Sequence, residues 1–168
     1  MKISSFYGRI RRIVFVVLSL IAAAPSSATR PLFDQYTDGV HTGNIFPSKG
    51  SYVELPHNER IWEMRRREMQ NCSAVGGPVG MFKLEAGKLW LTGLAKCGGE
   101  LALQEIYPDI AIPTVAKWLT GTFKTILDFQ CYDAGVQPVY AVSQELIVKK
   151  GAVQSVTETR HDITACAK

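Results

Sequence analysis

The sequence lacks the short signatures of the common catalytic sites. No serine lies in a Gly-x-Ser-x-Gly turn, which exposes the nucleophile of many hydrolases. The glycine-rich stretch 75–80 has neither the lysine nor the following helix of a phosphate-binding loop. The histidines, His41, His57 and His161, are scattered along the chain, and we expect them at the surface. His161 and Asp162 are adjacent, so in a regular strand they would face opposite sides and could not form a dyad. We therefore do not expect an enzyme.

The sequence also lacks a hydrophobic run of the length that spans a bilayer. The apolar-and-small run at residues 13–24 has 12 residues, whereas a spanning helix needs about 20. The run follows a basic segment and precedes small residues at Ser26 and Ala28, which is the order found in a secretory signal peptide. We therefore interpret residues 1–28 as a signal peptide. We expect a periplasmic or secreted protein with no integral membrane segment after cleavage.

A basic surplus is absent once the signal peptide is removed. The 168-residue chain has a formal net charge of +4, from 19 Lys and Arg against 15 Asp and Glu. Four of the basic residues lie in the signal peptide, which leaves 15 charges of each sign in residues 29–168. These four are Lys2, Arg9, Arg11 and Arg12. A protein that binds nucleic-acid phosphates needs a basic surplus, so we expect no nucleic-acid partner.

The remaining chain is typical of one mainly β domain. Residues 29–50 are rich in Gly, Pro, Asp, Asn and Thr, which predicts an extended lead-in before a domain at 51–168. Residues 51–55 could form a short strand, and residues 58–71 have helical spacing and form the expected N-terminal helix. Six later segments have strand patterns: 79–85, 88–97, 100–107, 115–127, 137–149 and 152–163. This order predicts an antiparallel sandwich or a partly closed barrel, with the last segment at a sheet edge.

All four cysteines lie in the exported part of the chain: Cys72, Cys97, Cys131 and Cys166. Export favours disulfides, and four cysteines allow three pairings. We prefer the sequence neighbours, Cys72–Cys97 and Cys131–Cys166, each worth about 3–4 kcal/mol. Structural zinc sites usually have ligands about two to four residues apart. These cysteines are 25, 34 and 35 positions apart, so we expect no metal and no other cofactor.

A short motif occurs twice, because the Trp-Leu-Thr-Gly of residues 90–93 returns at residues 118–121. A duplicated ligand-binding strand with two tryptophans beside one groove would explain the repeat. Two core strands with the same packing explain it equally well, and we prefer this interpretation because so short a repeat is weak evidence of duplication. If the domain presents a recognition surface, we expect ligand or partner contacts at Trp90, Trp118 and Tyr107.

Together these features favour a small exported, disulfide-stabilised protein that acts by binding. A protein partner is the leading hypothesis, in an inhibitor or immunity-type role or within the cell envelope. The alternative is a small-ligand-binding β-barrel whose mouth carries Trp90, Trp118 and Tyr107. A small hydrolase using His57 or His161 is a third hypothesis. The identity of the partner and the oligomeric state stay open.

The first prediction concerns the start of the exported protein. Small residues at Ser26 and Ala28 place the cleavage site so that the mature chain begins near Thr29, and Pro25 disfavours a cut directly after Ala24. N-terminal sequencing of protein from the envelope or the medium checks this. Recovery of a chain that starts at Met1 would contradict export through this segment.

Overall fold

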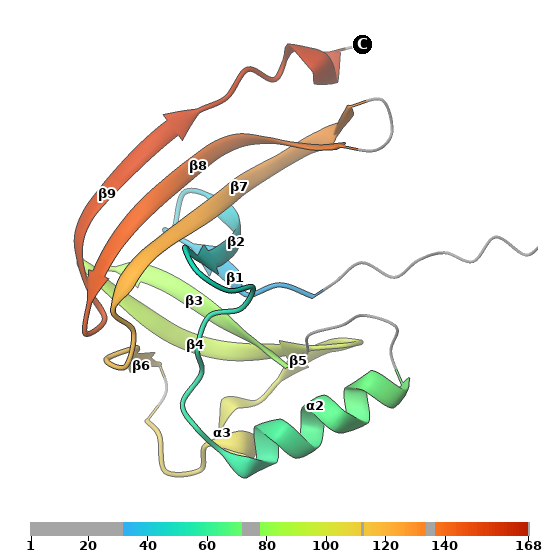
Figure 1. The fold of residues 1–168 in the computed structure, drawn as a ribbon, viewed down its shortest axis with the longest axis vertical. Helices are drawn as coiled ribbons and strands as arrows, with labels where there is room; N and C mark the ends of the chain where they lie inside the picture. Colours follow the sequence, from blue (N-terminus) through green and yellow to red (C-terminus); the bar gives the residue numbers. More distant parts are fainter. Residues whose placement is uncertain (1–31, 72–77, 112, 134–136, 168) are drawn as a thin grey trace, which may run out of the picture.

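The computed structural model describes residues 32–71, 78–111, 113–133 and 137–167, and these residues form a mainly β fold (Figure 1). The elements run in the order β1 (Gln35–Thr37), β2 (Thr42–Pro47), α2 (Glu59–Asn71), β3 (Val79–Glu85), β4 (Lys88–Lys96), β5 (Gly99–Leu101), α3 (Leu103–Ile106), β6 (Thr114–Val115), β7 (Gly121–Asp133), β8 (Gln137–Lys149), β9 (Ala152–Arg160) and η1 (Thr164–Ala167). The mainly β prediction is therefore confirmed. The helix is not N-terminal as predicted, because β1 and β2 precede it.

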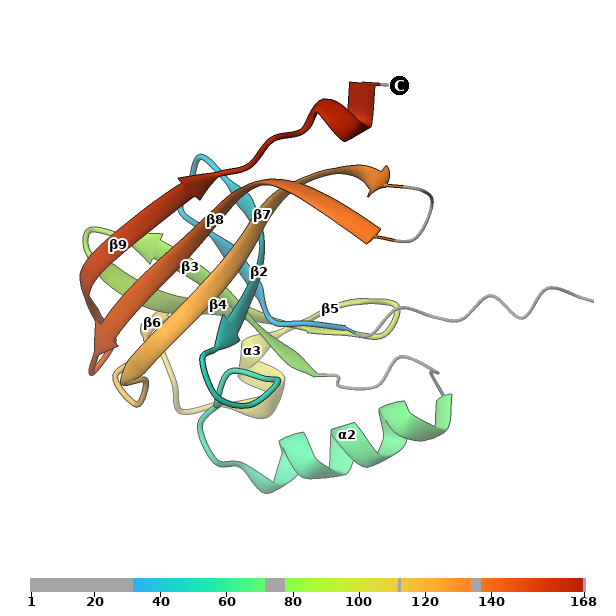
Figure 2. The same cartoon turned by 45° about the horizontal axis from the view of Figure 1, so that its top comes forward.

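The strands pair in the order β3-β1-β2-β7-β8-β9-β4-β5, and β3 also pairs with β4. All pairings are antiparallel except the parallel pairing of β1 with β3. The strand pairings therefore form a ring. Its weakest junction is between β4 and β9, which pair at one position, Lys88 with Ala152. Figures 1 and 2 show the result as two curved arms, β3–β4–β5 and β7–β8–β9, with β1 and β2 between them.

The strands β1 and β2 correct the expectation of an extended lead-in at residues 29–50. Between them they bury only two hydrophobic side chains, Tyr36 and Ile45, which is too few to produce an apolar period. The strands are nevertheless held on both sides, since β1 pairs with β2 and β3, and β2 pairs with β1 and β7. Residues 51–55 do not form the expected strand and run as irregular chain.

Three of the later strands, β3, β4 and β8, match the predicted segments closely, and two other segments are divided. The predicted strand at 115–127 becomes β6, a turn and then β7, so Trp118 lies in the turn instead of on a strand. The predicted strand at 100–107 becomes β5 and the short helix α3. Leu103 and Ile106 have helical spacing and both are buried, so a single helical turn satisfies the core there.

Buried side chains from both arms form one core. Leu89, Leu91 and Leu94 of β4 meet Leu127 of β7 and Leu146 of β8 in this core. The helix α2 contributes Ile61, and Asn58, directly before this helix, donates from Nδ2 to the carbonyl oxygen of Ile106 in α3 at 2.8 Å.

One of the two preferred disulfides is confirmed. Cys131 of β7 is bonded to Cys166 of η1, with 5.7 Å between their Cα atoms, so it ties the segment after β9 to the end of β7. Cys97 is also disulfide-bonded, and its preferred partner, Cys72, lies outside the described residues. Within the described ranges, no helix is long and apolar enough to cross a membrane.

A buried carboxylate joins three segments of the chain. Asp34, which precedes β1, is 2% exposed and accepts hydrogen bonds from the backbone N–H groups of Val53 and Gly80, both at 2.7 Å. The carbonyl oxygen of Asp34 also accepts the N–H of Ile45 at 2.9 Å. Asp34 therefore connects the β1–β2 pair, the irregular segment 51–55 and the start of β3.

The second prediction tests this contact. We expect Asp34→Ala to lower the free energy of unfolding by about 3 kcal/mol or more, because hydrogen bonds to a charged group are strong and the two N–H groups would stay buried without an acceptor. Asp109→Ala is the matched control, since Asp109 is exposed and should change stability by less than about 0.5 kcal/mol. Denaturant unfolding measures both, and equal stabilities of the two variants would contradict the structural role of Asp34.

Candidate functional site

The turn between β1 and β2 is a rigid polar loop. Asp38 Oδ1 accepts the backbone N–H groups of Val40 and His41, at 2.9 and 2.7 Å. Thr37 Oγ1 accepts the N–H of Gly39 at 3.0 Å and donates to the carbonyl oxygen of His41 at 2.8 Å. Gly39 has φ +89°, which a glycine adopts without strain. These bonds fix the directions in which Asp38 and His41 leave the turn.

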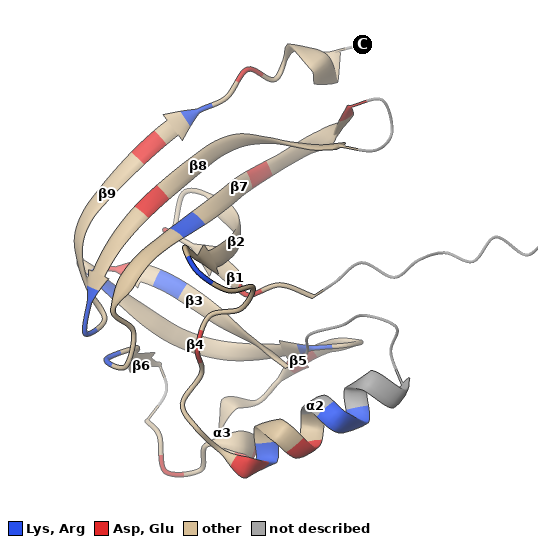
Figure 3. Cartoon of the chain, viewed as in Figure 1, with Lys and Arg blue, Asp and Glu red and all other residues tan. Residues whose placement is uncertain are grey.

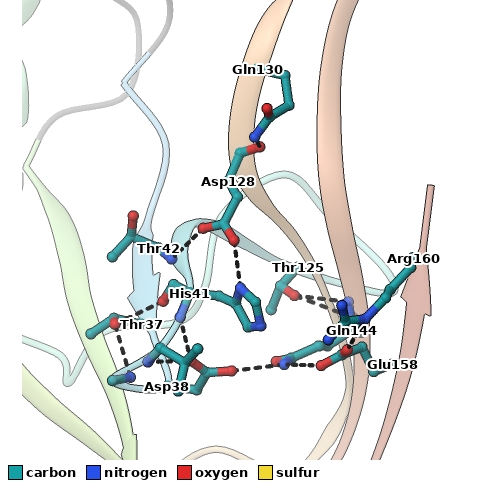
Figure 4. Close-up of polar contacts among 12 residues, drawn as sticks. Thr37, Asp38, His41, Thr42, Thr125, Asp128, Gln130, Gln144, Glu158 and Arg160 are labelled. Carbon is teal, nitrogen blue, oxygen red and sulfur yellow. Dashed lines mark hydrogen bonds and ion pairs between the residues drawn. The ribbon is translucent and has the colours of Figure 1, made fainter. Parts of the chain in front are cut away.

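The turn meets β7 through an ion pair. His41 Nδ1 contacts Asp128 Oδ2, and Asp128 Oδ1 accepts the N–H of Thr42 at 3.1 Å (Figure 4). Asp128 has φ +55°, a left-handed conformation that aspartate tolerates better than most residues. It lies just before the register shift between Phe129 and Cys131, where β7 bends relative to β8. The irregularity in β7 thus places the carboxylate over the β1–β2 turn.

A buried glutamine extends the contacts to β8 and β9. Gln144 is 5% exposed and its Oε1 accepts the hydroxyl of Tyr36 at 3.1 Å. Its Nε2 donates to Asp38 Oδ2 at 2.8 Å and to Glu158 Oε2 at 3.5 Å. We call Asp38, His41, Asp128, Gln144 and Glu158 the polar cluster. It connects the β1–β2 turn with all three strands of the β7–β9 arm.

The contacts of the polar cluster shift several pKa values. The hydrogen bond to Asp128 raises the pKa of His41, against an opposing effect of desolvation. The same bond, followed by the N–H of Thr42, lowers the pKa of Asp128. Desolvation opposes ionisation of Asp38, but bonds from His41, Gln144 and Val40 outweigh it and lower the pKa of Asp38. These contacts therefore stabilise the charged forms of both carboxylates and of the imidazole relative to their neutral forms.

The geometry supplies half of an acid–base site. Asp128 orients the His41 ring as the third member of a triad would, but no hydroxyl or thiol among the described side chains hydrogen-bonds to His41 Nε2. His161 Nε2 instead hydrogen-bonds to Ser143 Oγ at 2.8 Å, away from Asp128. His57 and His161 are exposed as expected, whereas the His41 side chain is only 17% exposed.

The three predicted contact residues lie in two separate places. Tyr107 is buried and its hydroxyl donates to the carbonyl oxygen of Pro56 at 2.7 Å. Trp118 Nε1 donates to the carbonyl oxygen of Glu54 at 2.8 Å, so both side chains hold the segment around residues 54–56. Trp90, on β4, donates to the carbonyl oxygen of Glu85 at 3.2 Å. These bonds fit side chains that support the fold, and a recognition role for them stays a prediction.

Sequence reasoning missed the polar cluster because its members are far apart in the chain. His41 and Asp128 are separated by 87 positions, and Gln144 and Asp38 by 106. Two local signals were present. Asp38-Gly39 is a common hairpin turn pair. Gln144 occupies the inward phase of an alternation that continues with Val142 and Leu146, where a polar side chain needs buried partners.

Comparison with known proteins adds no relative. No protein-family model, no curated protein and no solved structure matches the chain.

The third prediction concerns the ionisation of His41. We expect Asp128→Asn to lower the pKa of His41 toward its ordinary value, because the variant removes the charge while keeping an oxygen for the N–H of Thr42. NMR titration of the His41 ring protons measures this. Asp162→Asn is the matched control, since Asp162 is bonded to Thr164 and should leave the titration unchanged. An unchanged His41 pKa in Asp128→Asn would show that the ion pair does not form.

The same ion pair predicts a pH dependence of stability. The raised pKa of His41 stabilises the fold below the ordinary value of 6.5, and this contribution is lost as the pH rises through the folded value. The lowered pKa of Asp128 stabilises it above 3.8, and this contribution is lost as the pH falls through the folded value. The difference in melting temperature between the wild type and Asp128→Asn should therefore be largest between pH 3.8 and pH 6.5, and it should shrink as the pH rises through the folded pKa of His41. A difference that grows at alkaline pH would contradict this assignment.

Proposed function

We propose that this is an exported, disulfide-stabilised protein that acts by binding another protein, whose extended segment pairs with the free edge of β9. The observation that carries the proposal is that most of β9 is paired with a strand on one side only. Residues 155–160 pair with β8 on one side, and no strand in the described ranges pairs with them on the other. Figure 2 shows β9 at the border of the β7–β9 arm.

The edge lacks several of the features that protect exposed strands, and the two that it has, the bulge at Gln154 and the inward-facing Glu158, lie on either side of residues 155–157. Natural sheets shield their edges with lysine, proline, short strands or a covering element. Here β9 has nine residues and contains neither Lys nor Pro. Its composition, with two valines and two threonines, suits further strand pairing. Main-chain hydrogen bonds from such an edge can bind an extended peptide of a partner.

An exposed apolar side chain on this edge favours a partner segment with an apolar residue. Val156 pairs with Leu146 and so points toward the core side of the sheet, yet it is 43% exposed. Leu146, one strand further in, is completely buried. A partner strand paired with β9 would bury Val156, and an apolar side chain of that strand could pack beside it.

The rest of the arm holds the edge in place. The disulfide Cys131–Cys166 anchors the chain that follows β9, and the polar cluster connects Glu158 of β9 to Gln144 and the β1–β2 turn. A pre-ordered edge loses little conformational entropy on binding. Charges of both signs are interspersed on α2 and on the β7–β9 arm (Figure 3), which agrees with a protein partner rather than a polyanion.

The strand pairings also support a partly closed barrel over a sandwich. They form a ring through β1, β2, β7, β8, β9, β4 and β3, whose β9–β4 junction is the single pair Lys88–Ala152. A small-ligand barrel therefore remains the second hypothesis. Its proposed mouth residues, Trp90, Trp118 and Tyr107, do not favour it, because each is bonded to a backbone carbonyl group.

The fourth prediction tests the β9 edge. A photo-crosslinking residue in place of Thr157 should trap one protein from the envelope or the medium, because Thr157 lies in the middle of the unpaired edge. With that partner purified, we expect Val156→Lys to weaken binding by about tenfold or more, since an edge lysine prevents strand addition.

The matched control is Ile147→Lys on β8. Ile147 and Val156 have similar exposed fractions, 47% and 43%. Adjacent residues of a strand face opposite sides of the sheet, so Ile147 faces away from the core side on which Leu146 and Val156 lie. This variant should bind the partner with unchanged affinity. Binding that survives Val156→Lys, or the absence of any protein cross-linked at Thr157, would contradict the proposed function.

A further inference from the structure

Two adjoining hollows lie along the strand β2. One, of about 430 Å³, is lined by residues of β1 to β4 that include Gln35 and Met81. The other, of about 630 Å³, is lined by residues of β7 and β8 that include Phe129 and Tyr140. Both are lined by residues 42–44, and we call the two hollows together the outer groove. Its two parts have the volumes of small-ligand sites, typically about 300–1,000 Å³.

The floor of the outer groove is backbone. Gly43 lines both hollows, and a Cβ there would collide with the carbonyl oxygen of Ile126, because β2 passes very close to β7. Close packing alone accounts for this glycine. Gly43 presents only backbone to both hollows, and its neighbours Thr42 and Asn44 line both of them as well.

The electrostatics of the outer groove favour a neutral ligand. Its lining contains no lysine or arginine, and Asp128 is the one acidic residue among the lining side chains. Asp128 already contacts His41, and this contact raises the pKa of His41. A phosphate or sulfate would therefore lack a cation, and a cationic ligand would compete with His41 for the carboxylate.

The backbone beneath the groove excludes a strand-forming peptide. The strand β1 is paired with β2 and β3, and β2 is paired with β1 and β7, so neither has an open edge at the residues that line the groove, 35–37 and 42–44. A ligand must be bound by side chains. These are amides and hydroxyls, at Gln35, Asn44 and Thr42, which can donate to and accept from sugar hydroxyls.

An aromatic surface borders the same groove. Phe129 is 46% exposed, and its ring packs against Tyr140 at 5.8 Å and against Tyr132 at 5.0 Å between centroids. The contacts hold the Phe129 ring in one orientation while leaving much of it accessible. A sugar ring presents C–H groups on one face and hydroxyls at its rim, and it can stack on such a ring while hydrogen-bonding to amides.

We propose that the outer groove binds a neutral oligosaccharide, with Phe129 as the stacking platform and Asn44 and Thr42 as hydrogen-bonding groups. The site is separate from the β9 edge, so it goes beyond the proposed function and does not depend on it. A partner bound at β9 would leave the groove open.

The fifth prediction uses three neutral tetrasaccharides as probes: β-1,4-linked glucose, β-1,4-linked N-acetylglucosamine and α-1,4-linked glucose. NMR titration of the mature protein should show saturable binding of at least one, with shifted amides in residues 42–44. We expect Phe129→Ala to weaken this binding by about tenfold, because one aromatic anchor often dominates a small interface. Thr42→Arg, at an exposed position shared by both hollows, should abolish it by filling the groove.

Two control variants distinguish sugar binding in the outer groove from partner binding at the β9 edge. Ile147→Ala removes an exposed apolar side chain on the same arm and should leave sugar binding unchanged. Val156→Lys should also retain sugar binding, even though it weakens partner binding at β9. A backbone circular dichroism spectrum verifies that each variant is folded. The proposal is overturned if none of the three sugars binds, if binding survives both Phe129→Ala and Thr42→Arg, or if the shifted amides lie outside the groove.

Discussion

The junction between β2 and β7 is the constraint on which the rest of the structure depends. The two arms share one core, and within the described residues strand pairing connects them along two routes, one through β1 and β2 and one directly from β4 to β9. On one side five residue pairs join β2 to β7, whereas on the other the single pair Lys88–Ala152 joins β4 to β9. Gly43 permits the close approach of β2, and the contact of His41 with Asp128 holds the preceding turn. Loss of this junction would leave each arm with a long open edge.

The unequal junctions explain where the two recognition surfaces lie. Because β9 meets β4 at one residue pair, the remainder of its edge stays available for a partner strand. Because residues 42–44 of β2 are paired with β1 and residues 43–47 with β7, the surface along residues 42–44 has no open strand edge and binds through side chains. The open edge and the paired strand therefore suit different ligands, an extended peptide and a neutral sugar. One sheet thus provides two separate proposed sites, with the polar cluster between them.

Strands with clear alternation of apolar residues could be predicted from the sequence. Segments whose structure depends on tertiary contacts could not. The strands β3, β4 and β8 could be read from their patterns because each buries several side chains on one face. The strands β1 and β2 could not, since their stability comes from pairing on both sides and from Asp34 instead of an apolar face. Trp118 follows the pattern of a strand, but Gly121 has φ +142° and breaks the strand into a turn and β7.

The candidate site was less predictable than the fold. Cys131–Cys166 could be anticipated because export and sequence order favour that pairing. The contact of His41 with Asp128 could not, because it depends on a left-handed residue at a strand irregularity and on a partner 87 positions away. A polar residue at an inward position, such as Gln144, was the strongest hint available, since burial requires it to find partners.

Native-state amide hydrogen exchange of the mature protein tests the central claim most directly. The claim is that β2 is held on both sides and that β9 is held on one. The account predicts slow exchange of the paired amides of β2, and in β9 an alternation of slow amides bonded to β8 with fast amides on the free edge, at residues 155–160. Uniform protection along β9, or fast exchange throughout residues 42–47, would contradict it.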